Sequence, residues 1–337
     1  MAILSLAQLE DVSSNLRHLA FDPATDTVEK TASELAYLNY YGLDLSESFP
    51  GTRHYLGSMA TGHFRIACQY WLPANLNSSL ESGLQQAEIQ KSGIKGTVFI
   101  THGYFDHVGI YGYLIRYLLQ QRYAVVAFDL PGHGNSSGER VTIETFDHYV
   151  EVFAELLRRC EPHLPRPWKA VGQSTGGAIL LKFLMAARPE RYENPLESVT
   201  LLAPLIHPTA WRVNLWVYRL IHRVVKNLRR KFMANTSDPV FNQFVATRDP
   251  LQDRHIPLEW VGAMKHWTEE FADLPVCDFP VKIIQGDKDT TVDWQYNLKA
   301  IKGKLPNAKI MMVSGAGHHL VNESVSLRKQ IFENIDV

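Results

Sequence analysis

The sequence of 337 residues is poor in cysteine, and its charges nearly cancel. The three cysteines, Cys68, Cys160 and Cys277, form no close pair, which argues against a disulfide framework and a CxxC zinc site. A net charge of −1 argues against general nucleic-acid binding, which needs a basic surface. No apolar run approaches the roughly 18 to 20 residues of a membrane span. The first residues lack a positively charged region and reach Glu10 and Asp11 early, so we expect no cleaved signal peptide and a reduced, cytoplasmic setting.

Internal repeats are also missing, and short apolar runs instead alternate with segments of helical periodicity. A hairpin is expected first, with two strands around a turn at Gly62. The alternating part follows, and this pattern predicts βαβ units and an α/β fold with a mostly parallel sheet covered by helices on both faces. The apolar runs lie within residues 96–103, 123–134, 169–174, 197–204, 280–289 and 307–319.

Three parts can be distinguished along the chain. Residues 1–50 are predicted to form an N-terminal extension, partly helical, and residues 51–204 and 277–337 the core. Residues 205–276 interrupt the rhythm, because they show helical periodicity but no strand run. We expect this interval to be a helical cap inserted between two core strands. The polar residues 74–93 are expected to form a loose surface loop.

A G-x-S-x-G motif follows the third of the alternating strands. Gly172, Ser174 and Gly176 make up the motif, which stands between a β-rich run and a helical run. A serine in such a strand-to-helix turn is strained and exposes its hydroxyl, and side chains at the flanking positions would clash. Ser174 is therefore a candidate nucleophile.

A serine hydroxyl is a poor nucleophile at neutral pH and needs a base that a third group orients. Downstream of Ser174, two later predicted strands each end in suitable residues. Their carboxyl ends are expected at the edge of the sheet where Ser174 emerges. The candidate acids are Asp287, Asp289 and Asp293, and the candidate bases are His318 and His319.

Four segments in combination carry a family resemblance: HGYFDH, DLPGHGNSSG, GQSTGG and the pair GDKD with GAGHHLVNE. From about residue 54 onward the chain resembles the α/β-hydrolase superfamily, and within it the monoacylglycerol lipase, lysophospholipase and serine-aminopeptidase-like group. The resemblance implies Asp289 as the acid and His318 as the base, with Asp287 or His319 as local alternatives.

The stretch THGYFDHVG has two interpretations. It resembles the zinc signature of metallo-β-lactamase-type hydrolases, but the middle histidine of that signature is Tyr104 here and no later cluster supplies a second set of ligands. The α/β-hydrolase resemblance instead implies an oxyanion loop, in which the backbone N–H groups of Tyr104 and Thr175 hold the developing negative charge. The remaining residues of the stretch are expected to support this loop: His102, Gly103, Asp106 and His107.

Three departures from the resembling family lie beside these motifs. Its members often have His before and Met after the nucleophile, where this chain has Gln173 and Thr175. They often have an Arg after the oxyanion loop, where this chain has Ile110. These changes leave the chemistry intact and put the identity of the substrate in doubt.

Residues 205–231 contain seven Lys or Arg and no Asp or Glu, which leaves 27 basic and 35 acidic residues for the rest of the chain. Apolar residues, among them Trp211 and Trp216, recur here at helical spacing. Such a helix can lie on an anionic lipid surface. The simpler interpretation is a cap helix that buries its apolar face on the core, because a cap must cover the site in any case.

Taken together, these patterns predict a serine carboxylic-ester hydrolase that forms an acyl-enzyme on Ser174. An apolar cap suits acyl chains, so the expected substrates are lipid-like esters such as monoacylglycerols or lysophospholipids. The mechanism requires no metal and no organic cofactor. Other possibilities for this fold are a serine aminopeptidase or amidase, an acyltransferase, and a non-catalytic binding protein.

Overall fold

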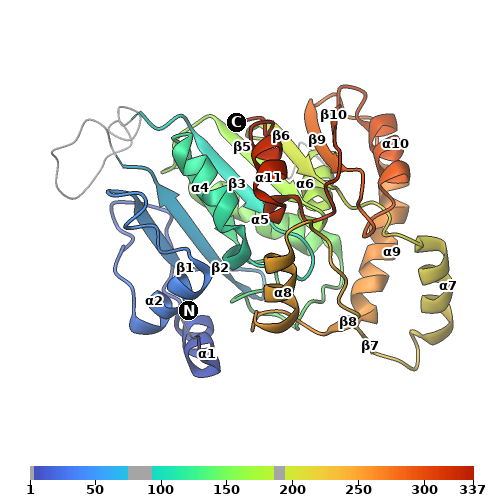
Figure 1. Cartoon of the computed structure of the whole chain (residues 1–337), viewed down its shortest axis with the longest axis horizontal. Helices are drawn as coiled ribbons and strands as arrows, with labels where there is room; N and C mark the ends of the chain where they lie inside the picture. The colour runs from blue at the N-terminus through green and yellow to red at the C-terminus, as the bar shows by residue number, and fades with distance from the viewer. Residues whose placement is uncertain (1–3, 75–92, 186–193) are drawn as a thin grey trace.

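A computed structural model describes residues 4–74, 93–185 and 194–337, and its central feature is an eight-stranded sheet (Figure 1). The strand order is β1-β2-β4-β3-β5-β6-β9-β10. From β4 to β10 all neighbouring strands are parallel, whereas β2 is antiparallel to both β1 and β4. The predicted α/β class with a mostly parallel sheet is therefore confirmed. The strands are β1 (Arg53–Thr61), β2 (Phe64–Leu72), β3 (Thr97–Thr101), β4 (Ala124–Phe128), β5 (Trp168–Gln173), β6 (Leu196–Leu202), β9 (Val281–Gly286) and β10 (Lys309–Val313).

Helices cover both faces of this sheet. Side chains alternate between the two faces along each strand, so neighbouring residues of one strand contribute to different buried clusters. In β3, Phe99 joins one buried cluster, whereas Val98 and Ile100 join the other. The first cluster includes residues of α5 (Phe146–Cys160), α6 (Thr175–Met185), α9 (Leu258–Asp273) and α10 (Trp294–Lys304). The second includes residues of α1 (Leu6–Asn15), α2 (Ala32–Tyr41), η1 (Val108–Tyr111), α4 (Gly112–Gln120), η2 (Leu320–Asn322) and α11 (Val325–Phe332).

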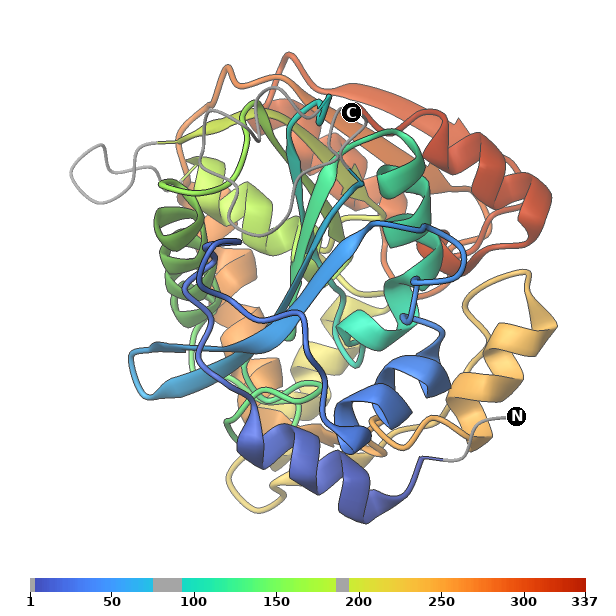
Figure 2. The same cartoon turned by 90° about the vertical axis from the view of Figure 1, so that its left-hand side faces the viewer.

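The N-terminal residues form two short helices on the β1–β2 side of the molecule (Figure 2). Each begins with a capping box, in which Ser5 or Thr31 and the residue three positions later exchange hydrogen bonds, so two otherwise unpaired N–H groups are satisfied. The phenolic Tyr40 Oη at the end of α2 donates to the carbonyl oxygen of Arg248 at 2.6 Å, so α2 contacts residues 205–276 directly. The loop predicted at 74–93 falls almost wholly outside the described residues.

Residues 205–276, called the inserted segment below, connect β6 to β9. They contain α7 (Trp211–Ile221), β7 (Asn227–Arg229), α8 (Pro239–Thr247), β8 (His255–Pro257) and α9. The expectation of no strand here is wrong, since β7 and β8 pair as an antiparallel ribbon. Three-residue strands are too short for the period-2 pattern to become visible in a sequence.

Helix α9 packs against the core and is fixed there by an ion pair. Met264, Trp267 and Phe271 of α9 belong to the first buried cluster. The ammonium group of Lys182 on α6, fully buried, contacts Glu270 of α9 and lies 3.1 Å from Asp147 on α5. The buried cation therefore joins three helices.

Helix α7 lies at the outer edge of the molecule, away from the sheet (Figure 1). Trp211 is buried, and Leu215 packs against the first cluster. Val213, Trp216 and Leu220, however, are 62%, 63% and 61% exposed. The favoured expectation that α7 buries its apolar face on the core is thus wrong for most of the helix, because its apolar residues extend over more than the one face that the core can cover.

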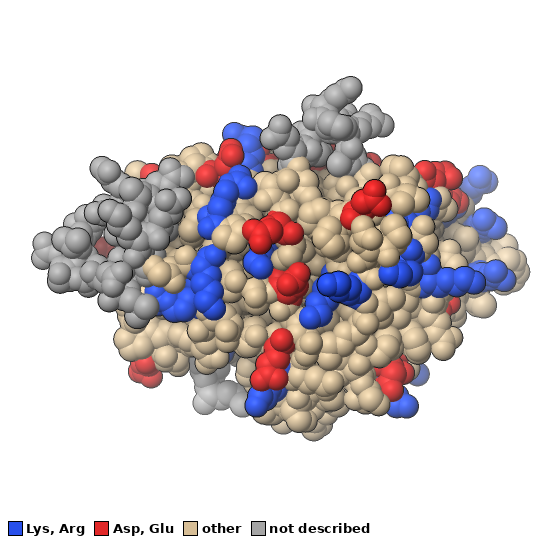
Figure 3. Space-filling view, turned by 90° about the horizontal axis from the view of Figure 1, so that it is seen from above, with Lys and Arg blue, Asp and Glu red and all other residues tan. Residues whose placement is uncertain are grey.

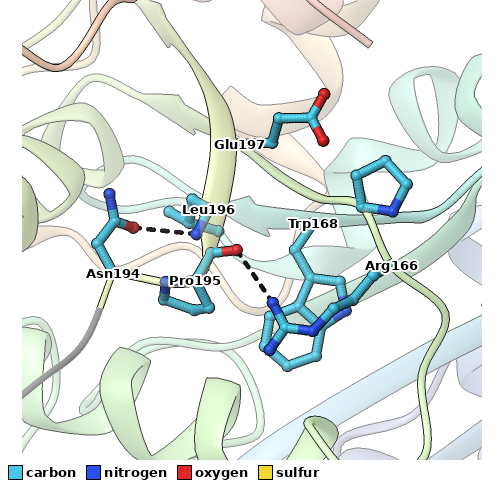
Figure 4. A pocket seen from close by; sticks show the side chains of 7 residues that line it. Arg166, Trp168, Asn194, Pro195, Leu196 and Glu197 are labelled. Atoms are coloured by element: carbon cyan, nitrogen blue, oxygen red, sulfur yellow. Dashed lines mark hydrogen bonds between the residues drawn. The ribbon is translucent and has the colours of Figure 1, made fainter.

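Elsewhere the surface is mixed in charge, and acidic and basic side chains are interspersed in the view from above (Figure 3). A shallow pocket lies between the starts of β5 and β6, where the Arg166 guanidinium stacks 4.4 Å above the Trp168 ring (Figure 4). Trp168 begins β5 and Ser174 follows its last residue, so this pocket and the candidate nucleophile lie at opposite ends of the strand. In the described part of the chain, every helix is too short or too polar to span a bilayer.

Candidate active site

Ser174 occupies the sharp turn between β5 and α6. Its φ of 54° lies in the left-handed region, which is uncommon for a residue other than glycine. The turn leaves no room for side chains beside it. A Cβ at Gly172 would lie 2.6 Å from the carbonyl oxygen of Gly176, and one at Gly176 would lie 2.1 Å from that of Thr101. The packing of strand against helix therefore requires both glycines of the motif.

Three side chains from three strand ends form a continuous hydrogen-bonded series. Ser174 Oγ lies 2.9 Å from His318 Nε2, and His318 Nδ1 lies 2.8 Å from Asp289 Oδ2. Asp289 follows β9 and His318 follows β10, so parallel strands bring together residues 144 and 29 positions apart. This geometry matches the order in which a base activates a serine hydroxyl and an acid orients the base.

The carboxylate of Asp289 is held on both oxygens. Oδ1 accepts the backbone N–H groups of Thr291 at 2.8 Å and Val292 at 3.1 Å. Oδ2, besides His318, accepts Gln285 Nε2 at 3.0 Å. These bonds fix the orientation of the carboxylate, and with it that of the imidazole.

Electrostatics within the series favour a charged imidazole. Burial alone would lower the pKa of His318, but the charge and hydrogen bond of Asp289 outweigh it and raise the pKa above the usual value of the ring. Burial would raise the pKa of Asp289, yet His318 outweighs it and keeps the carboxyl below its usual range. The pair thus stabilises an imidazolium beside an ionised carboxylate, as acid–base transfer from a serine requires.

The other candidate acids and the other candidate base lie apart from Ser174. Asp287 accepts Gly315 N–H at 2.8 Å, and Asp293 caps the start of α10. The Nε2 atom of His319 lies 3.0 Å from Asp106. The implied assignment to Asp289 and His318 is therefore the one that the hydrogen bonds support.

Two supports of the His318 loop could not be found from the sequence. The side chain of Gln173 donates to the carbonyl oxygen of His318 at 2.9 Å and accepts Leu320 N–H at 3.2 Å. The carbonyl oxygen of Asn235, in the inserted segment, accepts both His318 N–H at 2.8 Å and His319 N–H at 2.9 Å. In the sequence, Gln173 stands out only because members of the resembling family often have His at this position. No local pattern links Asn235 to residues some 80 positions later.

The predicted oxyanion loop lies beside Ser174. A Cβ at Gly103 would lie 3.4 Å from the Cβ of Ser174 and 2.8 Å from Asp106 Oδ2. Thr175 is the first residue of α6, so its N–H has no partner within the helix. The ring of Tyr104 stacks on Trp260 of α9 at a centroid distance of 3.7 Å, and its hydroxyl donates to Val141 at 2.6 Å.

Of the residues expected to support this loop, His102 and Asp106 form hydrogen bonds with its backbone at Gly103. His102 Nε2 accepts Leu130 N–H at 2.9 Å, and its Nδ1 lies 2.8 Å from the Gly103 carbonyl oxygen, which assigns a neutral ring with the proton on Nδ1. Burial lowers the pKa of His102, in agreement with that state. Asp106 Oδ2 accepts Gly103 N–H at 3.1 Å and the hydroxyl of Tyr111 at 2.8 Å.

His107 bonds away from the loop and toward the inserted segment. Its Nε2 lies 3.0 Å from Asp249 Oδ2, and both side chains are fully buried. His102, Asp106 and His107 therefore each contact separate protein groups. No cluster of three or more potential metal ligands occurs in residues 4–74, 93–185 and 194–337.

Comparisons with known proteins agree with this geometry. Residues 92–325 match the family described as Serine aminopeptidase, S33 (Hydrolase_4). The chain is 25% identical over 282 residues to a monoglyceride lipase homolog of Monkeypox virus, a match that covers 80% of this chain and 92% of the viral protein. It is 29% identical over 142 residues to monoglyceride lipase of Homo sapiens, covering 42% of this chain and 40% of the human protein.

Solved structures show the same fold. A soluble variant of monoglyceride lipase from Saccharomyces cerevisiae, in complex with a substrate analog, superposes with a TM-score of 0.66 at 17% identity. The match covers 82% of this chain and 92% of the yeast chain. The predicted enzyme class, a serine carboxylic-ester hydrolase, is confirmed by these matches. The chain accordingly belongs to the serine aminopeptidase S33 family of α/β-hydrolases and falls in its monoacylglycerol lipase-like group.

Proposed function

We propose that the protein hydrolyses carboxylic esters of lipid-like alcohols through an acyl-enzyme on Ser174. The observation that carries the proposal is the hydrogen-bonded series from Ser174 through His318 to Asp289, at 2.9 and 2.8 Å. His318 takes the hydroxyl proton while Ser174 Oγ attacks the ester carbonyl. Asp289 holds the imidazole and stabilises its cationic form.

The tetrahedral intermediate places negative charge on the former carbonyl oxygen. Tyr104 follows Gly103, where a Cβ would lie 3.4 Å from that of Ser174, and Thr175 follows Ser174 directly. The backbone N–H groups of these two residues are the proposed donors, each contributing about 3 to 4 kcal/mol. His318 then returns its proton to the leaving alcohol, and water repeats the sequence on the acyl-enzyme. The side chains of Ser174, His318 and Asp289, the two backbone N–H groups and water supply every group that these steps need.

Replacement of the nucleophile tests the mechanism. Ser174→Ala should abolish ester hydrolysis and labelling by a fluorophosphonate, with a loss of up to about a million-fold. Ser326→Ala, an exposed position on α11, is the matched control and should keep both. Labelling that persists in folded Ser174→Ala protein would assign the nucleophile to another residue.

A lipid-like substrate is supported by relatives named monoglyceride lipases and by the inserted segment, which we propose is the cap of the site. Trp260 of this segment stacks on Tyr104, and Trp211 and Met264 of the same segment belong to the same buried apolar cluster as Trp260. Each methylene that a substrate buries there contributes about 0.8 kcal/mol, so a few carbons should raise kcat/KM by one to two orders of magnitude. Equal activity from acetate to decanoate esters would contradict an acyl pocket.

We further propose that α7 contacts an anionic lipid surface. Its outward face combines exposed Trp216 and Leu220 with exposed Arg212 and Arg219, and exposed Arg223 follows in the turn after the helix. Apolar side chains flanked by cations are suited to the boundary between head groups and acyl chains. The predicted cytoplasmic location is untested and remains a prediction.

Vesicle binding tests this contact. Binding to phosphatidylserine vesicles should weaken with salt, because charges are screened over about 10 Å at 0.1 M. Trp216→Gln with Leu220→Gln should reduce vesicle binding and leave hydrolysis of a soluble ester unchanged. Val240→Gln, on α8 and 66% exposed, serves as the control for a general loss of exposed apolar surface. No binding at low salt would contradict the proposal.

An aminopeptidase activity is a second candidate, because the family description names one. The same serine chemistry cleaves amides when the leaving amine receives the proton from His318. Hydrolysis of aminoacyl amides, measured beside that of acetate and decanoate esters, decides between the two, since the proposed function requires faster turnover of acyl esters.

A further inference from the structure

The oxyanion loop is held in an unusual conformation by the inserted segment. Phe105, which follows Tyr104, has a φ of 67°, a region that bulky residues rarely adopt. Such a conformation persists only where the surroundings determine it. Two contacts do so here: Gln252 Nε2 donates to the carbonyl oxygen of Phe105 at 2.9 Å, and the Arg230 guanidinium lies 3.8 Å from the centre of the Phe105 ring.

Both polar atoms of the Gln252 amide form further hydrogen bonds. Its Oε1 accepts Arg230 Nη1 at 2.9 Å, and its Nε2 also lies 3.2 Å from Asp249 Oδ2. The two side chains that hold Phe105 are therefore bonded to each other. Gln252 is positioned in turn by Asp249.

Asp249 is a buried junction between three parts of the chain. Its Oδ2 meets His107 Nε2 at 3.0 Å, and its Oδ1 accepts the hydroxyl of Tyr41 at 2.7 Å and Leu251 N–H at 3.1 Å. His107 continues the oxyanion loop, and Tyr41 ends α2 of the N-terminal segment. A fully buried carboxylate remains ionised only with such partners, so removing one of them disturbs the others.

Residues 1–50 lie outside the part of the chain that matches the family, residues 92–325. The contact of α2 with the junction is nevertheless direct. Besides Tyr41, the hydroxyl of Tyr40 donates to the carbonyl oxygen of Arg248 at 2.6 Å, and the Tyr40 ring lies 5.9 Å from that of Phe244 on α8. The N-terminal segment thus holds the inserted segment at the point from which Gln252 reaches the loop.

We propose that Asp249 and Gln252 are positioning residues for the oxyanion hole, and that Tyr41 of the N-terminal segment holds them in place. The inference rests on the proposed function, because it assigns these residues to the loop that carries the Tyr104 N–H. Displacement of the inserted segment breaks the Gln252–Phe105 bond and releases the loop. The oxyanion hole is therefore complete only while the N-terminal helix, the inserted segment and the loop are in contact.

The first test removes the donor to Phe105. Gln252→Met keeps the length of the side chain and loses its N–H, so kcat on a soluble ester should fall by about ten- to hundred-fold, because the oxyanion bond is made in the transition state. KM should change by less than about twofold, since bonds formed only in the transition state leave substrate binding unaltered. Affinity for a trifluoromethyl ketone, which forms a tetrahedral adduct on serine, should fall in parallel with kcat/KM.

The second test uses the N-terminal segment. Tyr41→Phe removes only the hydroxyl that donates to Asp249. It should lower kcat by about three- to tenfold, because this hydrogen bond acts on the loop through two intervening residues, Asp249 and Gln252. The double variant Tyr41→Phe with Gln252→Met should be no slower than Gln252→Met alone, since both act on one contact. Tyr113→Phe, on α4 and 45% exposed, is the matched control.

The outcomes separate the two proposals. If Ser174→Ala protein still hydrolyses the ester, the proposed function fails. If Ser174→Ala is inactive while Gln252→Met keeps kcat and inhibitor affinity within about twofold, only the positioning role fails. Additive losses in the double variant would show that Tyr41 does not act through Gln252. A loss explained by a lower melting temperature, with KM raised as much as kcat falls, would also overturn the inference.

Discussion

Replacing Asp289 by asparagine should leave a folded protein with the wrong imidazole tautomer. The backbone N–H groups of Thr291 and Val292 both donate to Oδ1, and a backbone N–H can only donate a hydrogen bond. The amide oxygen of asparagine must therefore take the position of Oδ1. The amide NH₂ then faces His318 in place of Oδ2. Gln285 can turn its amide to accept from this NH₂, because its Oε1 has no hydrogen-bond partner among the described residues. His318 adapts by moving its proton to Nε2.

A proton on Nε2 removes the acceptor for the hydroxyl of Ser174, so the base is lost while its geometry persists. We expect kcat to fall by about ten-thousand-fold, as loss of the triad acid can produce, which corresponds to about 5 kcal/mol in the activation barrier. Steady-state hydrolysis of a soluble p-nitrophenyl ester measures the fall, and thermal unfolding checks the fold. The fluorophosphonate reaction should slow by a similar factor.

Asp287→Asn is the matched control for this prediction. Asp287 lies on the same loop but is partly exposed, and its carboxylate accepts hydrogen bonds from Ser314 Oγ and Gly315 N–H rather than from His318. Its replacement should change activity by no more than about twofold, as for other surface substitutions. Were Asp287→Asn the more damaging of the two, or Asp289→Asn as active as the control, the assignment of the acid would be wrong.

Three further results are expected. Gly176→Ala should yield inactive and destabilised protein, because its Cβ would lie 2.1 Å from Thr101 O; an active enzyme with an unchanged melting temperature would refute the packing argument. The value of kcat/KM should rise with pH through a midpoint above about 6.5, since the base acts when neutral and Asp289 raises the pKa of His318. A midpoint below that value in wild-type protein would contradict the pairing. Chelation by EDTA should leave hydrolysis unchanged, and stoichiometric zinc lost together with activity would restore the metal interpretation of residues 101–109.

The sheet and the Ser174–His318–Asp289 series were largely predictable from the sequence. Buried parallel strands are short apolar runs, so Thr97–Thr101 and Ala124–Phe128 stand out between helical segments. Ser174, Asp289 and His318 each follow such a run, and the carboxyl ends of parallel strands share one edge. The motif around Ser174 indicated the candidate nucleophile, because only small residues fit beside it, and the family resemblance selected Asp289 and His318 among the candidate acids and bases.

The junction at Asp249 could not be predicted, because its partners are distant in sequence. Tyr41 is 208 positions away and His107 is 142 positions away, and no local pattern links either residue to Asp249. The exposure of Trp216 was missed for a different reason. Helical periodicity shows that residues share a face, but it does not show whether that face meets the core or the solvent.

The ammonium group of Lys182 determines which parts of the protein can be exchanged with those of a relative. A chimera that imports residues 205–276 from a protein without an acid at position 270 would leave a buried cation with only the half-exposed Asp147 as partner. An unpaired buried charge costs several kcal/mol, a large share of the stability of a typical domain. The exchangeable unit therefore ends before α9, at about residue 257, so α7 and α8 can be exchanged while α9 stays with α6, to which it is paired.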